Sequence, residues 1–144
     1  MAAYIMKNAC SAIFALATAT VLSSTAWADG YPAVQLVSTA KTVMGEDIVY
    51  PASGQPQVNA MVLTLVPGEK TMLHTHGVPL FAYVLEGEIT VEYSGHGSRT
   101  FKKGEAFVEA MHVEHAGINL TEKPLKILAV YMGAVGSEDV IPVK

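Results

Sequence analysis

Short runs of β-branched and aromatic residues, separated by turns that contain glycine or proline, follow one another along the chain from about residue 30 onward. Apolar and polar residues tend to alternate within the runs, which is the period of a strand with one buried face. No long segment has the apolar spacing of an amphipathic helix. The turns at 67–68, 86–87, 94–97 and 103–104 give the strand spacing of a sandwich or barrel.

The pattern predicts a single all-β domain over residues 29–144, without internal repeats, low-complexity tracts or linkers. The predicted strands are 34–37, 47–50, 58–66, 71–76, 81–85, 89–93, 99–102, 106–109, 115–118 and 125–131. Aromatic and methionine side chains on these strands are predicted to form the core, some of them facing an apolar cavity: Phe81, Tyr83, Phe107, Met61, Met72 and Met111.

The first 28 residues have the organisation of a secretory signal peptide. Lys7 supplies the positive charge, residues 9–22 form the apolar core, and Ala26-Trp27-Ala28 is a small-x-small cleavage site. The apolar run is short for a span of a bilayer about 30 Å thick. We therefore expect a periplasmic or secreted protein after cleavage near Ala28, with no membrane association of the mature form.

Charge and cysteine content narrow the chemistry further. Cys10 is the only cysteine and lies in the signal peptide, so residues 29–144 offer no thiolate as a metal ligand or nucleophile. Lys7 is the only charged residue before Asp29, so the mature chain holds all 13 acidic residues and eight of the nine basic ones. This negative balance disfavours nucleic acid and anionic membranes as partners. A small molecule is the expected partner.

Three histidines suggest a metal site. His74 and His76 lie at i and i+2, which places both side chains on one face of a strand. His115, about forty residues later, is the best placed third ligand on a neighbouring strand. Three neutral imidazoles suit zinc, iron, copper or nickel. The histidines therefore predict a metal pocket on strands.

Two glycine-bounded motifs contain these histidines. The first is Gly68, five residues, His74-Thr75-His76, ten residues and Gly87. The second is Gly104, His115 and Asn119, with Ala110 and His112 between them. In this spacing the chain resembles a small single-domain cupin, although Ala110 and His112 stand where that family usually has proline and glycine.

The resemblance implies a double-stranded β-helix, also called a jelly-roll β-barrel, with one divalent ion held by residues of both motifs. It implies His74, His76 and His115 as ligands of Fe, Zn, Mn, Ni or Cu. It also implies a homodimer, for which residues 31–50 are the expected pairing segment, since an unpaired edge strand invites pairing.

The chain departs from the family at one ligand. The glutamate of the first motif falls on Leu80, and no carboxylate occurs between His76 and Leu85. Either three histidines leave open positions for water or substrate, or a carboxylate comes from elsewhere, for which Glu109 is the candidate. Glu109 is predicted as a catalytic base, a ligand, or a partner that orients a histidine.

Other assignments place some of these residues at the surface. If the strand register is shifted by one residue, Glu109 pairs with Lys102 or Lys103 instead. His112 is interpreted as a solvent-exposed loop residue, with a place at the pocket mouth as the alternative, and His96 as a surface residue in a hairpin tip.

The function expected from these residues is an exported metal-binding cupin that acts on or binds a small organic molecule. By analogy with three-histidine dioxygenases of the superfamily, oxygenation is expected if the metal is iron, with Glu109 as base. The alternative is a non-enzymatic periplasmic barrel that binds a small molecule or a metal. Turnover distinguishes the two.

Overall fold

The computed structural model describes residues 27–28 and 31–144. The signal peptide predicted for residues 1–28 lies outside the described residues, except for Trp27 and Ala28. The chain divides into two compact units, Met1–Val34 and Gln35–Lys144. In the first unit, β1 (Trp27–Ala28) and β2 (Tyr31–Pro32) pair in antiparallel fashion. No helix in the described part of the chain has the length and apolar character that a membrane span requires.

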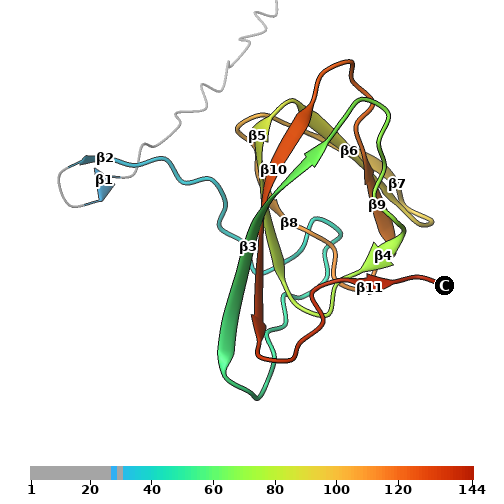
Figure 1. Ribbon diagram of the computed structural model, residues 1–144. Helices are drawn as coiled ribbons and strands as arrows, with labels where there is room; N and C mark the ends of the chain where they lie inside the picture. Colours follow the sequence, from blue (N-terminus) through green and yellow to red (C-terminus); the bar gives the residue numbers. More distant parts are fainter. Residues whose placement is uncertain (1–26, 29–30) are drawn as a thin grey trace, which may run out of the picture. The chain divides into compact units, whose positions relative to one another are not determined.

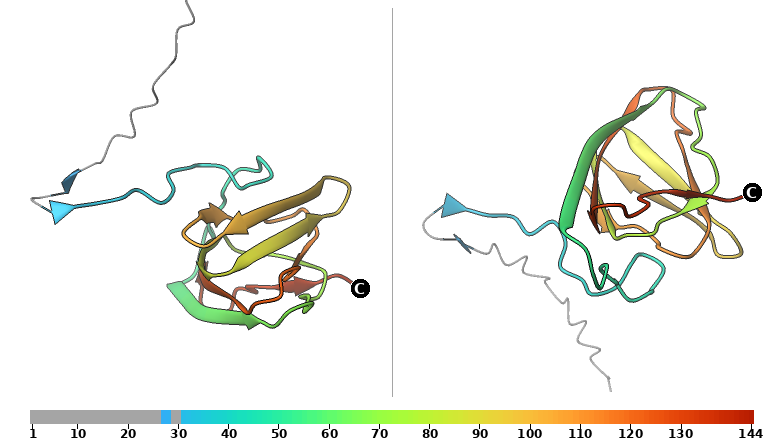
Figure 2. Two further views of the ribbon diagram at one scale, coloured as in Figure 1. Left: turned by 90° about the horizontal axis from the view of Figure 1, so that it is seen from above. Right: turned by 60° about the horizontal axis from the view of Figure 1, so that its bottom comes forward.

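The second unit consists of two antiparallel sheets. One sheet has the order β3 (Pro56–Leu65), β10 (Leu125–Ala134), β5 (Leu80–Glu86) and β8 (Ala106–Val108). The other has the order β11 (Ile141–Pro142), β4 (His74–Thr75), β9 (His115–Ile118), β6 (Glu88–Tyr93) and β7 (Gly97–Lys102). Figures 1 and 2 show these sheets facing each other around a common interior. The predicted all-β jelly roll is confirmed.

Strand alternation decides which side chains fill this interior. Along β5, Ala82 and Val84 are buried while Phe81 and Tyr83 are only half-buried. Along β6, Val91 and its neighbours on the same face are buried. The hairpin between the two strands turns at Gly87, where φ is 76° and a Cβ atom would lie 3.0 Å from a backbone oxygen. Glycine is therefore required at the end of the first motif.

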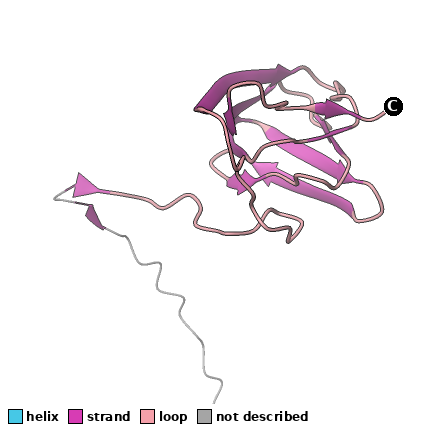
Figure 3. Ribbon diagram, turned by 90° about the horizontal axis from the view of Figure 1, so that it is seen from below, coloured by secondary structure: helices cyan, strands magenta, loops and turns pink. Residues whose placement is uncertain are grey.

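Several strand predictions were wrong in detail. Residues 34–37 form no strand, and in 47–50 only Asp47 makes an isolated bridge, with Lys41. These segments have apolar residues but no neighbouring strand to supply a ladder of hydrogen bonds. The predicted strand 71–76 is reduced to β4. The short strand β11 was not predicted, because two residues ending in proline give little strand signal. Figure 3 shows the loop segments that connect the strands of the second unit.

The core prediction needs a correction at two methionines. Met61 and Met72 are not core residues, since 42% of Met61 and 63% of Met72 is exposed. Both line the cavity described below, as was expected of some residues in this group. Met111 and Phe107 are buried, as predicted.

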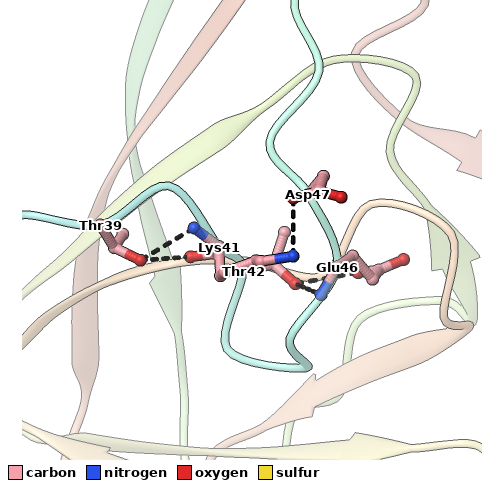
Figure 4. A network of polar contacts seen from close by, with 5 residues as sticks. All are labelled: Thr39, Lys41, Thr42, Glu46 and Asp47. Atoms are coloured by element: carbon pink, nitrogen blue, oxygen red, sulfur yellow. Dashed lines mark hydrogen bonds and ion pairs between the residues drawn. The ribbon is translucent and has the colours of Figure 1, made fainter.

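A loop that precedes the barrel strands is held in shape by its own polar contacts (Figure 4). The hydroxyl of Thr42 donates to Glu46, and Lys41 forms an ion pair with Asp47 at 2.6 Å. The hydroxyl of Thr39 bonds to the backbone oxygen and nitrogen of Lys41. The loop is joined to the barrel by a hydrogen bond from the Val43 nitrogen to the Val108 oxygen.

Candidate metal centre

Strand register brings the three predicted histidines together. His74 on β4 lies directly opposite His115 on β9. His115 in turn lies opposite Tyr93 on β6, so the three residues form a row across the sheet. His76 comes two residues after His74, and its backbone nitrogen donates to the Met111 oxygen. The separation in sequence between the two motifs is thus closed by pairing of β4 with β9.

The imidazoles form a compact cluster. One ring nitrogen from each of His74, His76 and His115 lies within 4.8 Å of the others. The ring centroids are 4.5 to 5.0 Å apart. His76 and His115 are almost completely buried. Such a group has the donor set of a three-histidine metal site.

Backbone carbonyls set the tautomer of all three rings. Nδ1 of His74 lies 2.7 Å from the Met72 oxygen, Nδ1 of His76 lies 2.8 Å from the Asp139 oxygen, and Nδ1 of His115 lies 2.8 Å from the Val113 oxygen. A carbonyl oxygen only accepts, so each Nδ1 carries the proton and donates it. Each neutral ring therefore has its lone pair on Nε2, the arrangement that metal-binding histidines use.

The contact between His76 and His115 shows that a cation fits this cluster. Their Nε2 atoms are 3.2 Å apart, and in the neutral rings both are acceptors. Protonation would relieve the contact, but burial lowers the pKa of His76 to about 3 and also lowers that of His115. Two Nε2 lone pairs thus face each other in a site where protonation is unfavourable. A metal ion that accepts both lone pairs would remove this repulsion. The chemistry of the donor set therefore fits one divalent ion.

Glu109 is buried and lines the same cavity as the histidines. It directly follows β8, and its Oε1 accepts hydrogen bonds from the Tyr93 hydroxyl and from the Ala110 nitrogen, both at 2.8 Å. Burial raises the pKa of Glu109 to about 7, against the effect of these two hydrogen bonds. The alternative of a surface pair with Lys102 or Lys103 is wrong, because the predicted strand register holds.

Leu80 occupies the position of the missing glutamate, and it too is buried and lines the cavity. The Glu109 nitrogen donates to the Leu80 oxygen at 2.9 Å, so Glu109 stands next to Leu80 on the neighbouring strand segment. A carboxylate thus lines the same cavity one strand away from Leu80. Among the described residues, the group whose ligand atoms lie within 4.8 Å of one another consists of the three histidines and does not include Glu109.

A second carboxylate holds the segment that follows Glu109. Glu46 accepts hydrogen bonds from the backbone nitrogens of Met111 at 2.8 Å and His112 at 2.7 Å. Burial acts to raise its pKa, but these two bonds and one from the Thr42 hydroxyl outweigh it and lower the pKa. Glu46 thereby fixes the loop that carries Glu109 and contacts His76.

The cavity between the sheets has a volume of about 390 Å³. It is lined by the side chains of both sheets and of the segments that join them: Met61, Leu63, Thr71, Met72, His74, His76, Leu80, Ala82, Ile89, Val91, Phe107, Glu109, His115, Gly117, Ile127, Ala129, Tyr131 and Val140. His112 is not among them and is exposed, as is His96. The cavity is large enough for a small organic molecule.

Three contributors to the site escaped the sequence analysis. Tyr93 was expected only as a strand end, and Tyr131, whose ring centroid is 5.6 Å from that of His76, as part of a core strand. Asp139 contributes a backbone oxygen, which leaves no trace in the sequence. The inward strand positions of the two tyrosines weakly indicated a role in the site, because a buried tyrosine needs a hydrogen-bond partner for its hydroxyl.

Comparison with known proteins agrees with this architecture. A family model described as cupin domain matches residues 61–131. No protein of curated function matches the sequence. Among solved structures, the chain is similar to an oxalate decarboxylase from Lactobacillus farciminis, determined as a formate complex, with 21% identity and a TM-score of 0.52 over 60% of this chain and 26% of that one.

Two further structures give the same picture. The polyketide cyclase RemF from Streptomyces resistomycificus has 19% identity and a TM-score of 0.51, over 65% of this chain and 63% of that one. The DMSP lyase DddQ from Ruegeria pomeroyi has 21% identity and a TM-score of 0.50, over 58% and 42%. This chain therefore spans between about a quarter and two thirds of these proteins, and likeness at this identity concerns the fold. The family match and the shared fold identify the barrel as a small cupin domain.

Proposed function

We propose that the chain binds one divalent metal ion through Nε2 of His74, His76 and His115 and acts on a small organic molecule in the cavity. The observation that carries the proposal is the cluster of three imidazoles, each with a ring nitrogen within 4.8 Å of the others and each with Nδ1 hydrogen-bonded to a backbone carbonyl, which leaves Nε2 with the lone pair. Fe, Zn, Mn, Ni and Cu all accept such ligands. When bound, the metal supplies a Lewis acid that polarises an oxygen of the substrate.

The protein's own contribution to the reaction is assigned to Glu109. Both of its hydrogen bonds fall on Oε1, and within the described residues none falls on Oε2. Oε2 is therefore the atom available to accept a proton from a substrate hydroxyl or carbon acid. A pKa of about 7 is suited to a general base near neutral pH. Tyr93 and the Ala110 nitrogen hold the carboxylate while the proton moves.

Enzymatic activity is proposed by analogy with structural neighbours of the same fold, which are a decarboxylase, a cyclase and a lyase. If the native metal is iron, we assign oxygenation of the bound molecule with O₂ as the second substrate. Export through the signal peptide at residues 1–28 and a homodimer complete the proposal. The mass of the protein recovered from the periplasm tests the first, and sedimentation at micromolar concentration tests the second.

A non-enzymatic barrel is the second candidate function. It is favoured by Leu80, which removes one carboxylate from the site and leaves an apolar wall beside the histidines. Such a barrel would retain a ligand without changing it. Measurement of product formation and oxygen consumption with candidate substrates separates a binder from an enzyme.

Metal content is the decisive experiment for the proposal. Protein purified without chelators is expected to contain close to one metal ion per chain, measured by plasma mass spectrometry. His74→Ala and His115→Ala should lose the metal, whereas His96→Ala, which changes an exposed histidine outside the cavity, should retain it. An equal, low metal content in all four proteins would overturn the metal site.

A further inference from the structure

The cavity lining indicates which molecules the site accepts. We propose that it binds an uncharged, largely apolar molecule of about two fused rings, with a hydroxyl or N–H group directed at Glu109. The inference deepens the proposed function, on which it rests for the position of the ligand beside the metal. The affinity of the cavity for this ligand, however, depends on side chains alone and can be measured without metal.

Apolar side chains make up most of the lining. Ile89 and Val91 come from one sheet, and Leu80, Ile127 and Ala129 from the other, so the ligand is enclosed between two apolar walls. An apolar cavity of about 150 Å³ holds one benzene molecule. A cavity of about 390 Å³ that opens to solvent therefore has space for roughly two fused rings.

The side-chain charges in the cavity, taken without a metal ion, disfavour an anionic ligand. Among the described residues that line it, none is lysine or arginine, and the one acidic side chain is Glu109. In the metal-free protein, an anion that enters must give up its hydration, and no side chain supplies a cation in exchange. A dianion such as oxalate would in addition face the Glu109 carboxylate. The lining thus differs from that expected for a small dicarboxylate.

One hydrogen-bond acceptor orients the ligand. Oε1 of Glu109 already accepts two hydrogen bonds. Oε2 has no such partner within the described residues, and it is not among the fully buried atoms, so a molecule in the cavity can reach it. A hydroxyl or N–H of the ligand that donates to Oε2 satisfies this acceptor in a water-poor site. An apolar ligand without a donor would leave it unsatisfied.

Exposure shows where the ligand enters. Met72, Met61 and Val140 are the lining residues with the largest exposed fractions, at 63%, 42% and 37%. Methionine side chains are flexible and polarisable, so they adapt to apolar surfaces of different shape. The entrance is therefore apolar, like the walls.

Matched probes test the inference on metal-free protein. 2-Naphthol is neutral at pH 7 and has one hydroxyl, whereas naphthalene-2-sulfonate has the same ring system with a permanent negative charge. Isothermal titration calorimetry should show 2-naphthol binding at least about tenfold more tightly than the sulfonate, and naphthalene more weakly than 2-naphthol. Equal affinity for naphthol and sulfonate, or no binding of naphthol, would overturn the inference.

A pair of neighbouring variants shows that the binding occurs in this cavity. Met72→Arg places a cation at the entrance, and Leu73→Arg places the same charge one residue later, on a side chain that is exposed but does not line the cavity. Both positions tolerate a long polar side chain because they are exposed. Met72→Arg should raise the affinity for the sulfonate about tenfold, and Leu73→Arg should leave it unchanged. An identical response of the two variants would contradict the assignment.

The two proposals fail in different ways. Loss of metal binding with retained selectivity for naphthol would reject the metal site and leave the ligand class standing. Stoichiometric metal with no selectivity between the probes would reject the ligand class and leave the metal site standing.

Discussion

The hydroxyl of Tyr93 donates a hydrogen bond to Oε1 of Glu109 at 2.8 Å and so connects the two sheets of the barrel. Tyr93 ends β6 in the five-stranded sheet, and Glu109 follows β8 in the four-stranded one. Both side chains are buried. Since Tyr93 also pairs with His115 across the sheet, this bond places the carboxylate relative to the histidine row.

Replacing Tyr93 with phenylalanine removes one of the two donors to Glu109 and leaves the packing of the ring. We expect the free energy of unfolding at pH 7 to fall by about 1–3 kcal/mol, the usual effect of removing one partner from a buried hydrogen bond. The bond from Tyr93 lowers the pKa of Glu109, so the pKa should rise above about 7 in the variant. Denaturant unfolding and NMR titration of the carboxyl carbon measure the two effects.

Tyr83→Phe is the matched control. Tyr83 is half-buried on the face of β5 opposite to the buried residues Ala82 and Val84, and its side chain makes no hydrogen bond within the described residues. It should leave both quantities nearly unchanged. Equal effects of the two substitutions would show that the Tyr93 hydroxyl does not support Glu109.

The parts of the site that follow from local pattern could be predicted from the sequence. His74 and His76 share a face because strand side chains alternate, and the glycine at 87 marks a hairpin that requires a positive φ. The same alternation along 106–109 allowed an inward Glu109, but the sequence left open a surface pair with Lys102 or Lys103 if the register shifted by one residue. His115 could be placed only through the spacing of the two motifs, since its pairing with β4 is a tertiary contact.

The parts that depend on long-range pairing could not be predicted. Residues 34–37 have strand-forming residues, but whether a strand forms depends on a partner with free hydrogen-bonding groups. The oxygen of Asp139 that bonds His76 belongs to the backbone, and every residue type carries that atom. Glu46 reaches Met111 and His112 across 65 or more residues, a distance that no periodicity encodes.

The stability of the metal-free protein should depend on pH through Glu109. Its pKa is raised from 4.5 to about 7 on folding, so the folded state favours the protonated acid. The associated stabilisation is complete below pH 4.5 and is lost as the pH rises through 7. The slope is at most about 1.4 kcal/mol per pH unit. Denaturant unfolding between pH 4 and 8 measures it, with Glu109→Gln as the non-titrating reference.

The histidines change the stability with pH in the opposite direction to Glu109, and they do so in both wild type and Glu109→Gln. The lowered pKa of His76, about 3, means that stability is lost as the pH falls below 6.5. This contribution largely cancels when wild type and Glu109→Gln are compared at each pH. A difference that stays constant or grows in favour of wild type with rising pH would contradict the raised pKa of Glu109.

Leu80→Glu should restore a carboxylate at the position where the first motif lacks it. Without metal, the variant should be less stable than Leu80→Gln at pH 7, because a second acid is then buried beside Glu109. With zinc as the probe, its metal affinity should exceed that of wild type by at least about tenfold, or about 1.4 kcal/mol. Competition with a chromophoric chelator measures the affinity. An affinity no higher than that of Leu80→Gln would mean that position 80 does not reach the ion.

Glu46→Gln tests whether the loop that carries Glu109 is fixed from outside the barrel. Both carboxylate oxygens of Glu46 are needed, because Oε2 accepts from the Met111 nitrogen and Oε1 from the His112 nitrogen. An amide offers only one oxygen, so its NH₂ group must face one of the two N–H donors. We expect a loss of about 1–3 kcal/mol in the free energy of unfolding.

Hydrogen exchange should locate this loss in the same loop, since the amides of Met111 and His112 lose protection before the strands do. Glu69→Gln is the matched control: Glu69 accepts one backbone hydrogen bond, from Val66, through a single oxygen that the amide retains. That substitution should change the unfolding free energy by no more than about 0.5 kcal/mol. If Glu46→Gln is equally mild and leaves exchange at 111 and 112 unchanged, the carboxylate does not hold the loop. The position of Glu109 would then depend on Tyr93 and the strand pairing alone.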